Sequence, residues 1–507
     1  MNTSSNENAA HYFVDRHVDE GRADKTAFIE GDRSLTYGEL AEQSGRVPDL
    51  YARHGLRQEE RSAMLVHDVI EFPIIFWGSL KAGIVPVAIN TMLTTEQYRY
   101  ILKDSRARAL FVSAPLLDTV RPILQDLPDL QSVFVVGGDD MAGLNFRSEL
   151  EVSDLSPVAD VSADDTAFWL YSSGSTGEPK GVRHVHSALK ATADTYGAQV
   201  LGIREADTIY SAAKLFFAYG LGNGMTFPMS VGATAVLLPT RPTPDAVFGI
   251  MQSVEPTIYC GVPTLYGAML AVAGDQIPGT RRLRISISAG EALPQDLGNR
   301  WRELTGTEIL DGVGSTEMLH IFLSNAPGSV EYGTSGVAVP GYDLRLVDTE
   351  GAEVGPDEVG ELLVKGASAS DGYWNQREKS RRTFEGEWTR TGDKYTRRGD
   401  GRYIYCGRTD DMFKVSGQWV SPFEVEQALI SHPAVLEAAV VPALDEEGLE
   451  KPKAFIVLKP ENTQIDKVAL QTHVKSAIGN WKYPRWIEVV ADLPKTATGK
   501  IQRFKLR

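Results

Sequence analysis

The chain has 507 residues and a net charge of −16, from 51 Lys and Arg against 67 Asp and Glu. This acidic balance argues against nucleic acid or an anionic membrane surface as the main partner. A content of 42% hydrophobic and 23% charged residues is ordinary for a soluble globular enzyme, and the length corresponds to about three domain-sized units.

Cysteine usage and the first residues bear on the compartment. Cys260 and Cys406 are the two cysteines, they lie far apart, and they show no metal-ligand or disulfide spacing. The opening MNTSSNENAAHYFVDRH is polar and has no apolar core of a signal peptide. No apolar run reaches the roughly 18 residues of a membrane span. We therefore expect a reducing, cytoplasmic setting.

Up to about residue 330 the chain alternates between helix-like and strand-like stretches. In FPIIFWGSLKAGIVPVAIN (72–90) the pattern predicts an apolar helix that ends near Gly83, then a β-branched strand that leads to Pro86. Further buried strands are predicted in RALFVSA (108–114) and SVFVVGG (132–138), at about Ala167–Tyr171, and in GATAVLLP (232–239), PTIYCGVP (256–263) and LRISISA (283–289). Such alternation predicts an α/β fold with mostly parallel sheets covered by helices.

Beyond about residue 330 the pattern changes to short strands with Gly and Asp turns, as in GYDLRLVDTEG (341–351), GELLVKG (360–366) and GRYIYCGR (401–408). The last hundred or so residues predict a small α+β unit. FEVEQALISHPAV (423–435) reads as an amphipathic helix, and EAAVVPAL (437–444) and KAFIVLKP (453–460) read as strands. We place a domain boundary at Asp410, between residues 1–409 and 410–507.

The run YSSGSTGEPKGVRHVH (171–186) has the residue types of a phosphate-binding loop. Backbone N–H groups of such a turn form a nest for an anion, and Lys180 adds a positive charge. The hydroxyl donors are Ser172, Ser173, Ser175 and Thr176, and the glycines that let the backbone approach a ligand are Gly174, Gly177 and Gly181. The residue order is not that of a Walker P-loop, because Lys180 follows Gly177 at a distance. A flexible Ser/Gly linker is the alternative, but a linker would not follow a buried strand.

A second candidate is LDGVGSTEMLHIFLSN (310–325). Gly312 and Gly314 make the backbone approachable, Thr316 offers a hydroxyl, and Glu317 offers a carboxylate. Mg²⁺ typically takes one or two carboxylates together with substrate phosphates, so Glu317 fits a magnesium ligand. The alternative is a helix N-terminal capping pattern, with Ser315 or Thr316 before Glu317.

Two more polar motifs follow. Asp393 lies in a Thr-Gly-Asp sequence that we interpret as a tight turn, where its carboxylate can accept two hydroxyls such as those of a ribose. Arg408 follows a strand and can pair with phosphate or ribose. Lys500 lies in a glycine turn near the last residue. Each of these, taken singly, is more typical of an ordinary surface residue.

Together these motifs resemble the adenylate-forming superfamily, which includes acyl- and aryl-CoA synthetases, luciferases and peptide-synthetase adenylation domains. The resemblance covers the whole chain. Family motifs are matched by residues 173–181, by Ser315, Thr316 and Glu317, by Thr391, Gly392 and Asp393, by residues 407–414, and by residues 494–500. NAAHYFVDRHV (8–18), KAGIVPVAIN (81–90), KLFFAYGLGN (214–223) and GSTEMLHIFLSN (314–325) are similar to bacterial benzoate–CoA ligases and their hydroxy- and aminobenzoate relatives.

The resemblance implies a fold of several domains. A large N-terminal domain would hold two helix-covered β-sheets and a distorted β-barrel subdomain, and a small α+β C-terminal domain would be mobile. It implies a ligase of aromatic acid metabolism that uses ATP, Mg²⁺ and coenzyme A. The acid would first become an aryl adenylate, with release of pyrophosphate, and the aryl group would then pass to the thiol of coenzyme A.

The resemblance also implies roles for individual residues. Lys500 would bridge the acid and the α-phosphate, Glu317 and Thr176 would hold Mg²⁺, and Asp393 and Arg408 would contact the ribose. The remaining nucleotide contacts would come from Ser172, Ser173, Gly174, Ser175, Gly177, Lys180, Gly290, Glu291, Asp311, Gly312, Ser315 and Thr316.

The family's second half-reaction requires rotation of the C-terminal domain. Asp410 would be the hinge, because such a motion concentrates its dihedral change in a few residues. Rotation would withdraw Lys500 and bring the coenzyme A side of the domain, Lys414 and Gly417, toward the acid. Gly417 has no side chain, so a pantetheine arm could pass against it.

By position in the family, the aryl acid lies between two walls. One consists of Phe217, Ala218 and Tyr219, and the other of Gly312, Gly314, His320 and Ile321. Small residues beside aromatic rings leave a flat slot for one aryl ring. Phe217 occupies the position at which many relatives have a histidine. His320 is either a packed wall residue or a hydrogen-bond partner of a substituent on the aryl ring.

Benzoate is the substrate that we expect first. Anthranilate and hydroxybenzoates remain alternatives, because a single polar contact can determine whether an amino or hydroxyl group on the ring is accepted or rejected. Two other functions remain open: a free-standing enzyme that loads an aryl group onto a carrier protein, and a catalytically silent adenylate-binding protein. We expect a monomer or homodimer with no nucleic-acid or membrane partner.

Overall fold

The structure is a computed structural model that describes residues 7–138, 143–172, 178–415, 418–460, 462, 464–495 and 501–507. The chain forms two compact units. Unit 1 contains Met1–Tyr332, Gly336–Asp343 and Val364–Thr389, and unit 2 contains Gly333–Ser335, Leu344–Leu363 and Arg390–Arg507. The predicted boundary at Asp410 lies inside unit 2 and stays a prediction about the border of a moving domain.

Two large sheets form the framework of unit 1. The nine-stranded sheet has the order β16 (Val337–Ala338), β15 (Ile321–Ser324), β14 (Ile309–Gly314), β13 (Ile285–Ala289), β12 (Ile258–Gly261), β10 (Thr208–Ser211), β11 (Thr234–Val236), β1 (Thr26–Glu30) and β2 (Arg33–Thr36). The eight-stranded sheet has the order β19 (Gly372–Tyr373), β9 (Lys180–Val185), β8 (Thr166–Ser172), β4 (Val85–Ala88), β3 (Arg61–Leu65), β5 (Ala109–Ser113), β6 (Ser132–Val136) and β7 (Leu144–Asn145).

Parallel pairing dominates the interior of both sheets, as the alternating sequence predicts. The run from β14 through β13, β12, β10 and β11 to β1 is parallel, and so is the run from β8 through β4, β3, β5 and β6 to β7. Antiparallel strands lie at the edges, among them β9 beside β8 and β15 beside β14. The carboxyl ends of the parallel strands therefore share one edge in each sheet, where loops carry functional residues.

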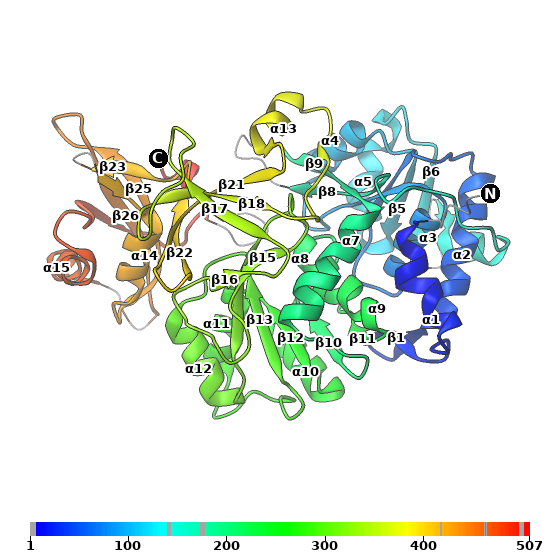
Figure 1. Cartoon of the computed structure of the whole chain (residues 1–507), viewed down its shortest axis with the longest axis horizontal. Helices are drawn as coiled ribbons and strands as arrows, with labels where there is room; N and C mark the ends of the chain where they lie inside the picture. The colour runs from blue at the N-terminus through cyan, green and yellow to red at the C-terminus, as the bar shows by residue number, and fades with distance from the viewer. Residues whose placement is uncertain are drawn as a thin grey trace. The chain divides into compact units, whose positions relative to one another are not determined.

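Helices cover these sheets, with α10, α11 and α12 beside the strands β10 to β13 (Figure 1). The α-helices of unit 1 are α1 (Arg16–Asp19), α2 (Tyr37–Arg53), α3 (Glu71–Lys81), α4 (Thr95–Ser105), α5 (Leu117–Val120), α6 (Phe146–Glu151), α7 (His186–Thr192), α8 (Ala218–Leu221), α9 (Phe227–Val231), α10 (Pro244–Val254), α11 (Pro263–Val272), α12 (Gln295–Thr305) and α13 (Arg377–Thr383). Short 3₁₀ or π-helical segments cover His11–Asp15, Ala114–Leu116, Arg121–Asp126, Ala193–Val200 and Gly222–Thr226. Among the described residues, none of the helices combines the length and the apolar character needed to cross a membrane.

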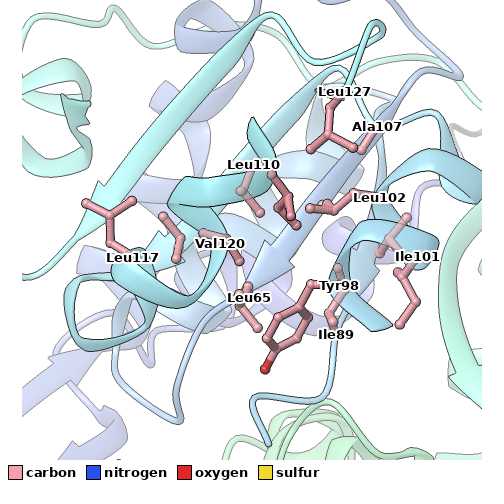
Figure 2. Packing of buried hydrophobic residues seen from close by; sticks show 14 of the residues in the cluster. Leu65, Ile89, Tyr98, Ile101, Leu102, Ala107, Leu110, Leu117, Val120 and Leu127 are labelled. Carbon is pink, nitrogen blue, oxygen red and sulfur yellow. The ribbon is translucent and has the colours of Figure 1, made fainter. Parts of the chain in front are cut away.

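Helix α4 shows how the sequence builds this arrangement. Thr94 caps its first turn, with Oγ1 accepting from the Gln97 N–H while the Gln97 side chain accepts from the Thr94 N–H. Tyr98, Ile101 and Leu102 follow at helical spacing and turn one face toward the sheet. They pack with Leu65, Leu110 and neighbouring apolar side chains in one buried cluster (Figure 2). Burial of each large apolar side chain stabilises the fold by about 1.5–3 kcal/mol.

Unit 2 has the β-rich character that the sequence predicts. A five-stranded sheet contains β17 (Asp343–Val347), β18 (Gly360–Lys365), β21 (Trp388–Arg397), β20 (Phe384–Glu385) and β22 (Tyr403–Arg408); β20 belongs to unit 1, and β22 lies wholly in unit 2. The distorted β-barrel subdomain stays a prediction. The α+β part contains β23 (Phe413–Val415), β24 (Gln418–Val420), α14 (Pro422–Ile430), β25 (Val435–Leu444), β26 (Glu450–Leu458), α15 (Lys467–Ile478), β27 (Trp486–Val489) and a 3₁₀ turn at Arg503–Lys505. The predicted α/β class with several domains is confirmed.

Candidate active site

The candidate phosphate loop connects two paired strands at the edge of the parallel region. Strands β8 and β9 are antiparallel neighbours, and Ser172 at the end of β8 pairs with Lys180 at the start of β9. The intervening Ser173, Gly174, Ser175, Thr176 and Gly177 lie outside the described residues. The Ser172 Oγ is buried and has no hydrogen-bond partner within the described part of the chain. The two ends of the loop are thus fixed by strand pairing.

Lys180 lies in a polar cluster with Glu317 and Tyr373. The Lys180 Nζ is 3.5 Å from Glu317 Oε1 and donates to the Tyr373 hydroxyl at 3.2 Å. The Tyr373 hydroxyl in turn donates to Glu317 Oε1 at 2.8 Å. Burial alone would raise the pKa of Glu317, but the Lys180 charge and the Tyr373 hydrogen bond outweigh it and lower this pKa. Glu317 is therefore an ionised carboxylate at neutral pH.

Tyr373 has no role in the sequence-based predictions. It belongs to the short strand β19, which pairs with β9 through the Tyr373–Val182 register. This pairing carries its hydroxyl to Lys180, which is 193 residues away along the chain. The only sequence signal for Tyr373 is an aromatic residue after Gly372. This signal is weak, because tyrosine is common in strands for packing reasons alone.

The capping interpretation of the Ser-Thr-Glu motif is wrong in one respect. The Ser315 Oγ does accept a hydrogen bond from the Met318 N–H, at 3.1 Å. However, residues 315–320 form a turn between the antiparallel strands β14 and β15, and no helix begins there. Ser315 therefore stabilises the turn that presents Thr316 and Glu317 at the end of β14.

Asp393 and Arg408 face each other across the strands β21 and β22 of unit 2. The Arg408 Nη1 donates to Asp393 Oδ1 at 3.0 Å and to the Thr391 carbonyl at 3.1 Å. The expected tight turn at Thr391–Gly392–Asp393 is not present, because β21 continues through all three residues. Gly392 has φ +72°, a left-handed conformation that bends the strand, and this is what the glycine provides here.

One predicted wall of the acid pocket begins helix α8. Phe217 precedes the helix, Ala218 opens it, and the Tyr219 hydroxyl lies 3.1 Å from both the Gly261 and the Ile287 carbonyl oxygens. Gly261 is the last residue of β12 and Ile287 lies in the middle of β13, so the hydroxyl is held by two neighbouring strands of the nine-stranded sheet. Burial raises the pKa of Tyr219 well above its usual value. Its hydroxyl is therefore a neutral donor to these carbonyls.

On the opposite wall, Gly312 and Gly314 lie where β14 packs closely against the segment that leads into β15. A Cβ atom on Gly312 would lie 2.9 Å from the Ile321 side chain, and one on Gly314 would lie 2.5 Å from the His320 carbonyl oxygen. Both glycines pair with β15, through Ser324 and Ile321 respectively. The sequence-based interpretation explained these glycines by approach to a ligand. The structure shows that close packing of β14 against β15 already requires them.

His320 is buried among aromatic rings. Its ring lies 4.5 Å from that of Phe227 and 5.2 Å from that of Tyr196, and Nε2 is 3.3 Å from the Tyr219 carbonyl oxygen. Burial lowers the pKa of His320 to about 3, so the ring is neutral at physiological pH. These contacts are those of a packed wall residue. Its buried Nδ1 has no hydrogen-bond partner within the described part of the chain.

The predicted nucleotide contacts after β13 and on β14 also lie in unit 1. Asp311 is buried on β14, next in register to Ser288, and its Oδ2 accepts from the Leu293 N–H at 3.4 Å. Burial raises the pKa of Asp311 to about 8. Gly290 follows β13 with φ +94°, and Glu291 comes directly after it. The loop from Gly290 to Leu293 is thereby held against β14.

The predicted hinge and coenzyme A residues lie in unit 2. The Asp410 carbonyl accepts from Arg507 Nη2 at 3.1 Å, and the same arginine pairs with Asp411 at 2.9 Å. Lys414 is exposed on β23. Gly417 and the predicted catalytic Lys500 lie outside the described residues. The last residues of the chain are thus bound to the segment around Asp410.

A lysine and an ionised carboxylate beside a hydroxyl-rich sequence are groups suited to an anion such as a nucleotide phosphate. Residues 14–374 match the AMP-binding enzyme family, and residues 424–500 match the AMP-binding enzyme C-terminal domain. The chain belongs to the AMP-binding enzyme family.

Relatives that match over the full length of the chain include benzoate–CoA ligases. The chain is 56% identical to a 4-hydroxybenzoate–CoA/benzoate–CoA ligase of Rhodopseudomonas palustris, over 99% of this chain and 94% of that protein. It is 54% identical to a benzoate–CoA ligase of Thauera aromatica, over 99% and 95% respectively. A benzoate CoA ligase from Burkholderia xenovorans LB400 has a similar crystal structure, with a TM-score of 0.90, 48% identity, and coverage of 99% of this chain and 100% of that one. The resemblance predicted from the motifs is confirmed.

Proposed function

We propose that this protein is an ATP-dependent aryl-CoA ligase that activates benzoate or a close benzoate analogue. The observation that carries the proposal is the Lys180–Glu317–Tyr373 cluster at the foot of the phosphate loop, in a chain whose full-length relatives are benzoate–CoA ligases. ATP and coenzyme A are the substrates that accompany the acid.

The proposed chemistry proceeds in two steps. A carboxylate oxygen of the acid attacks the α-phosphorus of ATP, the bond to the bridging oxygen breaks, and pyrophosphate leaves with that electron pair. The product is a mixed anhydride between the acid and AMP. The sulfur of coenzyme A then attacks the carbonyl carbon, AMP leaves with the oxygen that came from the acid, and the thiol proton passes to solvent. Reactions of this kind depend mainly on positioning and charge neutralisation.

Residues around the phosphate loop fit the first step. Lys180 and the backbone between Ser172 and Lys180 would hold the departing phosphates. Glu317 fits a Mg²⁺ ligand because it is an ionised oxygen donor beside the loop, and Mg²⁺ completes its shell with phosphates and water. Within the described residues no cluster of three or more His, Cys, Asp or Glu side chains forms an all-protein metal site. Glu317 and Thr176 would hold the ion, and Mg²⁺ bound there would lower the effective charge of the phosphates.

Residues of unit 2 would hold the sugar and the reacting groups. The Asp393 carboxylate, oriented by Arg408, is suited to accept both ribose hydroxyls. Lys500 is proposed to bridge the acid and the α-phosphate, Asp410 to be the hinge, and Lys414 and Gly417 to contact coenzyme A. We further propose a cytoplasmic protein that acts as a monomer or homodimer.

Asp393→Ala is expected to raise the KM for ATP by about 100-fold or more, because each of the two hydrogen bonds from the ribose hydroxyls to the carboxylate contributes about 1.5–3 kcal/mol. The KM for the acid should change little. Steady-state kinetics with each substrate varied would measure this. Asp400→Ala is a matched control, since it removes another carboxylate, which lies in the loop that connects β21 and β22. An equal rise in the KM for ATP in both variants would contradict the ribose role of Asp393.

The acid pocket favours a single aryl ring. Phe217, Ala218 and Tyr219 and the β14–β15 segment offer apolar surface, with His320 neutral and packed among rings. We propose benzoate as the best substrate. The purified protein should release AMP and form an aryl-CoA with benzoate, and a panel of hydroxy-, amino- and fluorobenzoates should follow with lower kcat/KM.

Two alternatives have distinct outcomes in the same assay. A carrier-loading enzyme would release pyrophosphate with benzoate but would acylate a phosphopantetheinyl carrier protein faster than free coenzyme A. A silent adenylate-binding protein would bind ATP and release no pyrophosphate with any acid of the panel. The formation of ADP and phosphate in place of AMP and pyrophosphate would overturn the proposed function altogether.

A further inference from the structure

A buried ion pair joins the two sheets of unit 1 next to the proposed acid pocket. Asp68 is 3% exposed and lies in the loop after β3 of the eight-stranded sheet. Its Oδ1 accepts from the Leu215 N–H at 3.2 Å, and its Oδ2 is 3.8 Å from the Nζ of Lys214. Lys214 and Leu215 lie in the loop after β10 of the nine-stranded sheet. Each loop follows the carboxyl end of a parallel strand.

Lys214 is also bound to a third loop. Its Nζ donates to the carbonyl of Leu238 and, at 2.7 Å, to that of Thr240, both of which follow β11. The ammonium group therefore has oxygen partners from two loops, those after β3 and β11, and the Lys214 side chain is 13% exposed. A charge that is largely buried is stable only when its partners hold it, and because Asp68 also accepts from the Leu215 N–H, the backbone beside Lys214 is tied to the loop after β3.

The same lysine begins the predicted acid wall. The Lys214 carbonyl accepts from the Phe217 N–H at 3.0 Å, and the Phe217 carbonyl accepts from the Leu221 N–H at 2.8 Å. A Cβ atom on Gly220 would lie 2.0 Å from the Lys214 carbonyl oxygen, so the turn closes tightly upon itself. Residues 217–219 are contained in this turn. A displacement of Lys214 therefore displaces Phe217, Ala218 and Tyr219 as a group.

We propose that Asp68 and Lys214 are positioning residues that set the place of the 217–219 wall and thereby the choice among aryl acids. This proposal rests on the proposed function, in which that wall contacts the acid. Neither side chain touches the substrate in this account, because their polar atoms are bound to Leu215, Leu238 and Thr240. Their effect is exerted through the backbone of the turn.

The first test is Asp68→Asn, which keeps the size of the side chain and an acceptor for Leu215 but removes the charge that faces Lys214. We expect the KM for benzoate to rise about tenfold and the preference for benzoate over 4-hydroxybenzoate and 2-aminobenzoate to fall about as much. The KM for ATP should remain within about twofold. An unchanged KM for benzoate with unchanged preference would overturn the proposal.

A matched control separates positioning from general stability. Lys81 and Asp15 form another pair with a buried lysine in unit 1, at 2.6 Å, and their hydrogen bonds do not involve residues 214–220. Asp15→Asn should lower the unfolding temperature without changing acid preference. A similar change of preference in both variants would show a general loss of structure and would contradict the proposal.

The double variant Asp68→Asn/Lys214→Met covers the case in which the single variant fails to fold. Removal of both charges leaves no buried charge without a partner, so the unfolding temperature should recover. A positioning role predicts that the KM for benzoate stays raised despite this recovery, and a purely structural role predicts a normal KM, which would overturn the proposal. The unmodified protein is assayed in parallel. If it is inactive with every aryl acid, the proposed function is overturned together with this inference. If it is active and the variants have the same KM and acid preference as the unmodified protein, only this inference is overturned.

Discussion

Lys500→Ala is expected to slow formation of the aryl adenylate by about 100- to 1,000-fold, the typical loss when one preorganised donor to a developing negative charge is removed. The pentavalent phosphorus gathers charge as the carboxylate attacks, and a lysine that bridges both groups neutralises it. Thioester formation from preformed benzoyl-AMP should remain within about threefold of the unmodified protein, because the proposed domain rotation withdraws Lys500 from the reacting groups before that step. Single-turnover assays of each half-reaction would measure the two rates.

Lys505→Ala is the control for this prediction. Lys505 is an exposed lysine in the same last segment of the chain, so its removal changes the net charge equally. It should leave both half-reactions unaltered. Equal losses in the two half-reactions of Lys500→Ala would contradict a role confined to adenylation.

Glu317→Gln is expected to lower kcat/KM for ATP by about 100-fold or more and to raise the Mg²⁺ concentration needed for half-maximal rate, since a neutral amide is a poor ligand for a hard cation. The amide oxygen can still accept the hydrogen bond of Tyr373, so the local packing is preserved. Titration of the initial rate with Mg²⁺ at fixed ATP would measure the effect.

Tyr373→Phe separates the charge of Glu317 from its hydrogen bond. The variant removes the hydroxyl that donates to Glu317 and accepts from Lys180, but it keeps the carboxylate. A loss of about 10- to 150-fold in kcat/KM for ATP is expected, which corresponds to one hydrogen bond to a charged group, about 1.5–3 kcal/mol. If the Glu317→Gln variant shows the same Mg²⁺ dependence as the unmodified protein, Glu317 is no metal ligand.

The sequence predicts the local features of this fold well because they depend on neighbouring residues. Alternating apolar runs predict the parallel strands, and the helix predicted to end near Gly83 does so at Lys81. The hydroxyl- and glycine-rich run after β8 is recognisable without the structure, since an anion needs donors and an approachable backbone in one short stretch.

Other features depend on which strands lie side by side, which one sequence does not reveal. Tyr373 reaches Lys180 only because β19 pairs with β9, and Asp68 reaches Lys214 only because two sheets meet. The glycines at 312 and 314 are required by β15 across the ladder, where the sequence suggested a ligand. Thr391–Gly392–Asp393 was interpreted as a turn because the residue types allow it, whereas pairing with β22 keeps it within a strand.

The central claim is that the acid becomes bound to AMP through its own oxygen. Benzoate labelled with ¹⁸O in both carboxylate positions tests this directly, with mass spectrometry of the AMP formed in the presence of ATP and coenzyme A. The account predicts AMP that carries one ¹⁸O atom, because the oxygen that attacks phosphorus stays on it when the thiol displaces AMP. Unlabelled AMP, or label found in inorganic phosphate, would contradict an adenylate intermediate.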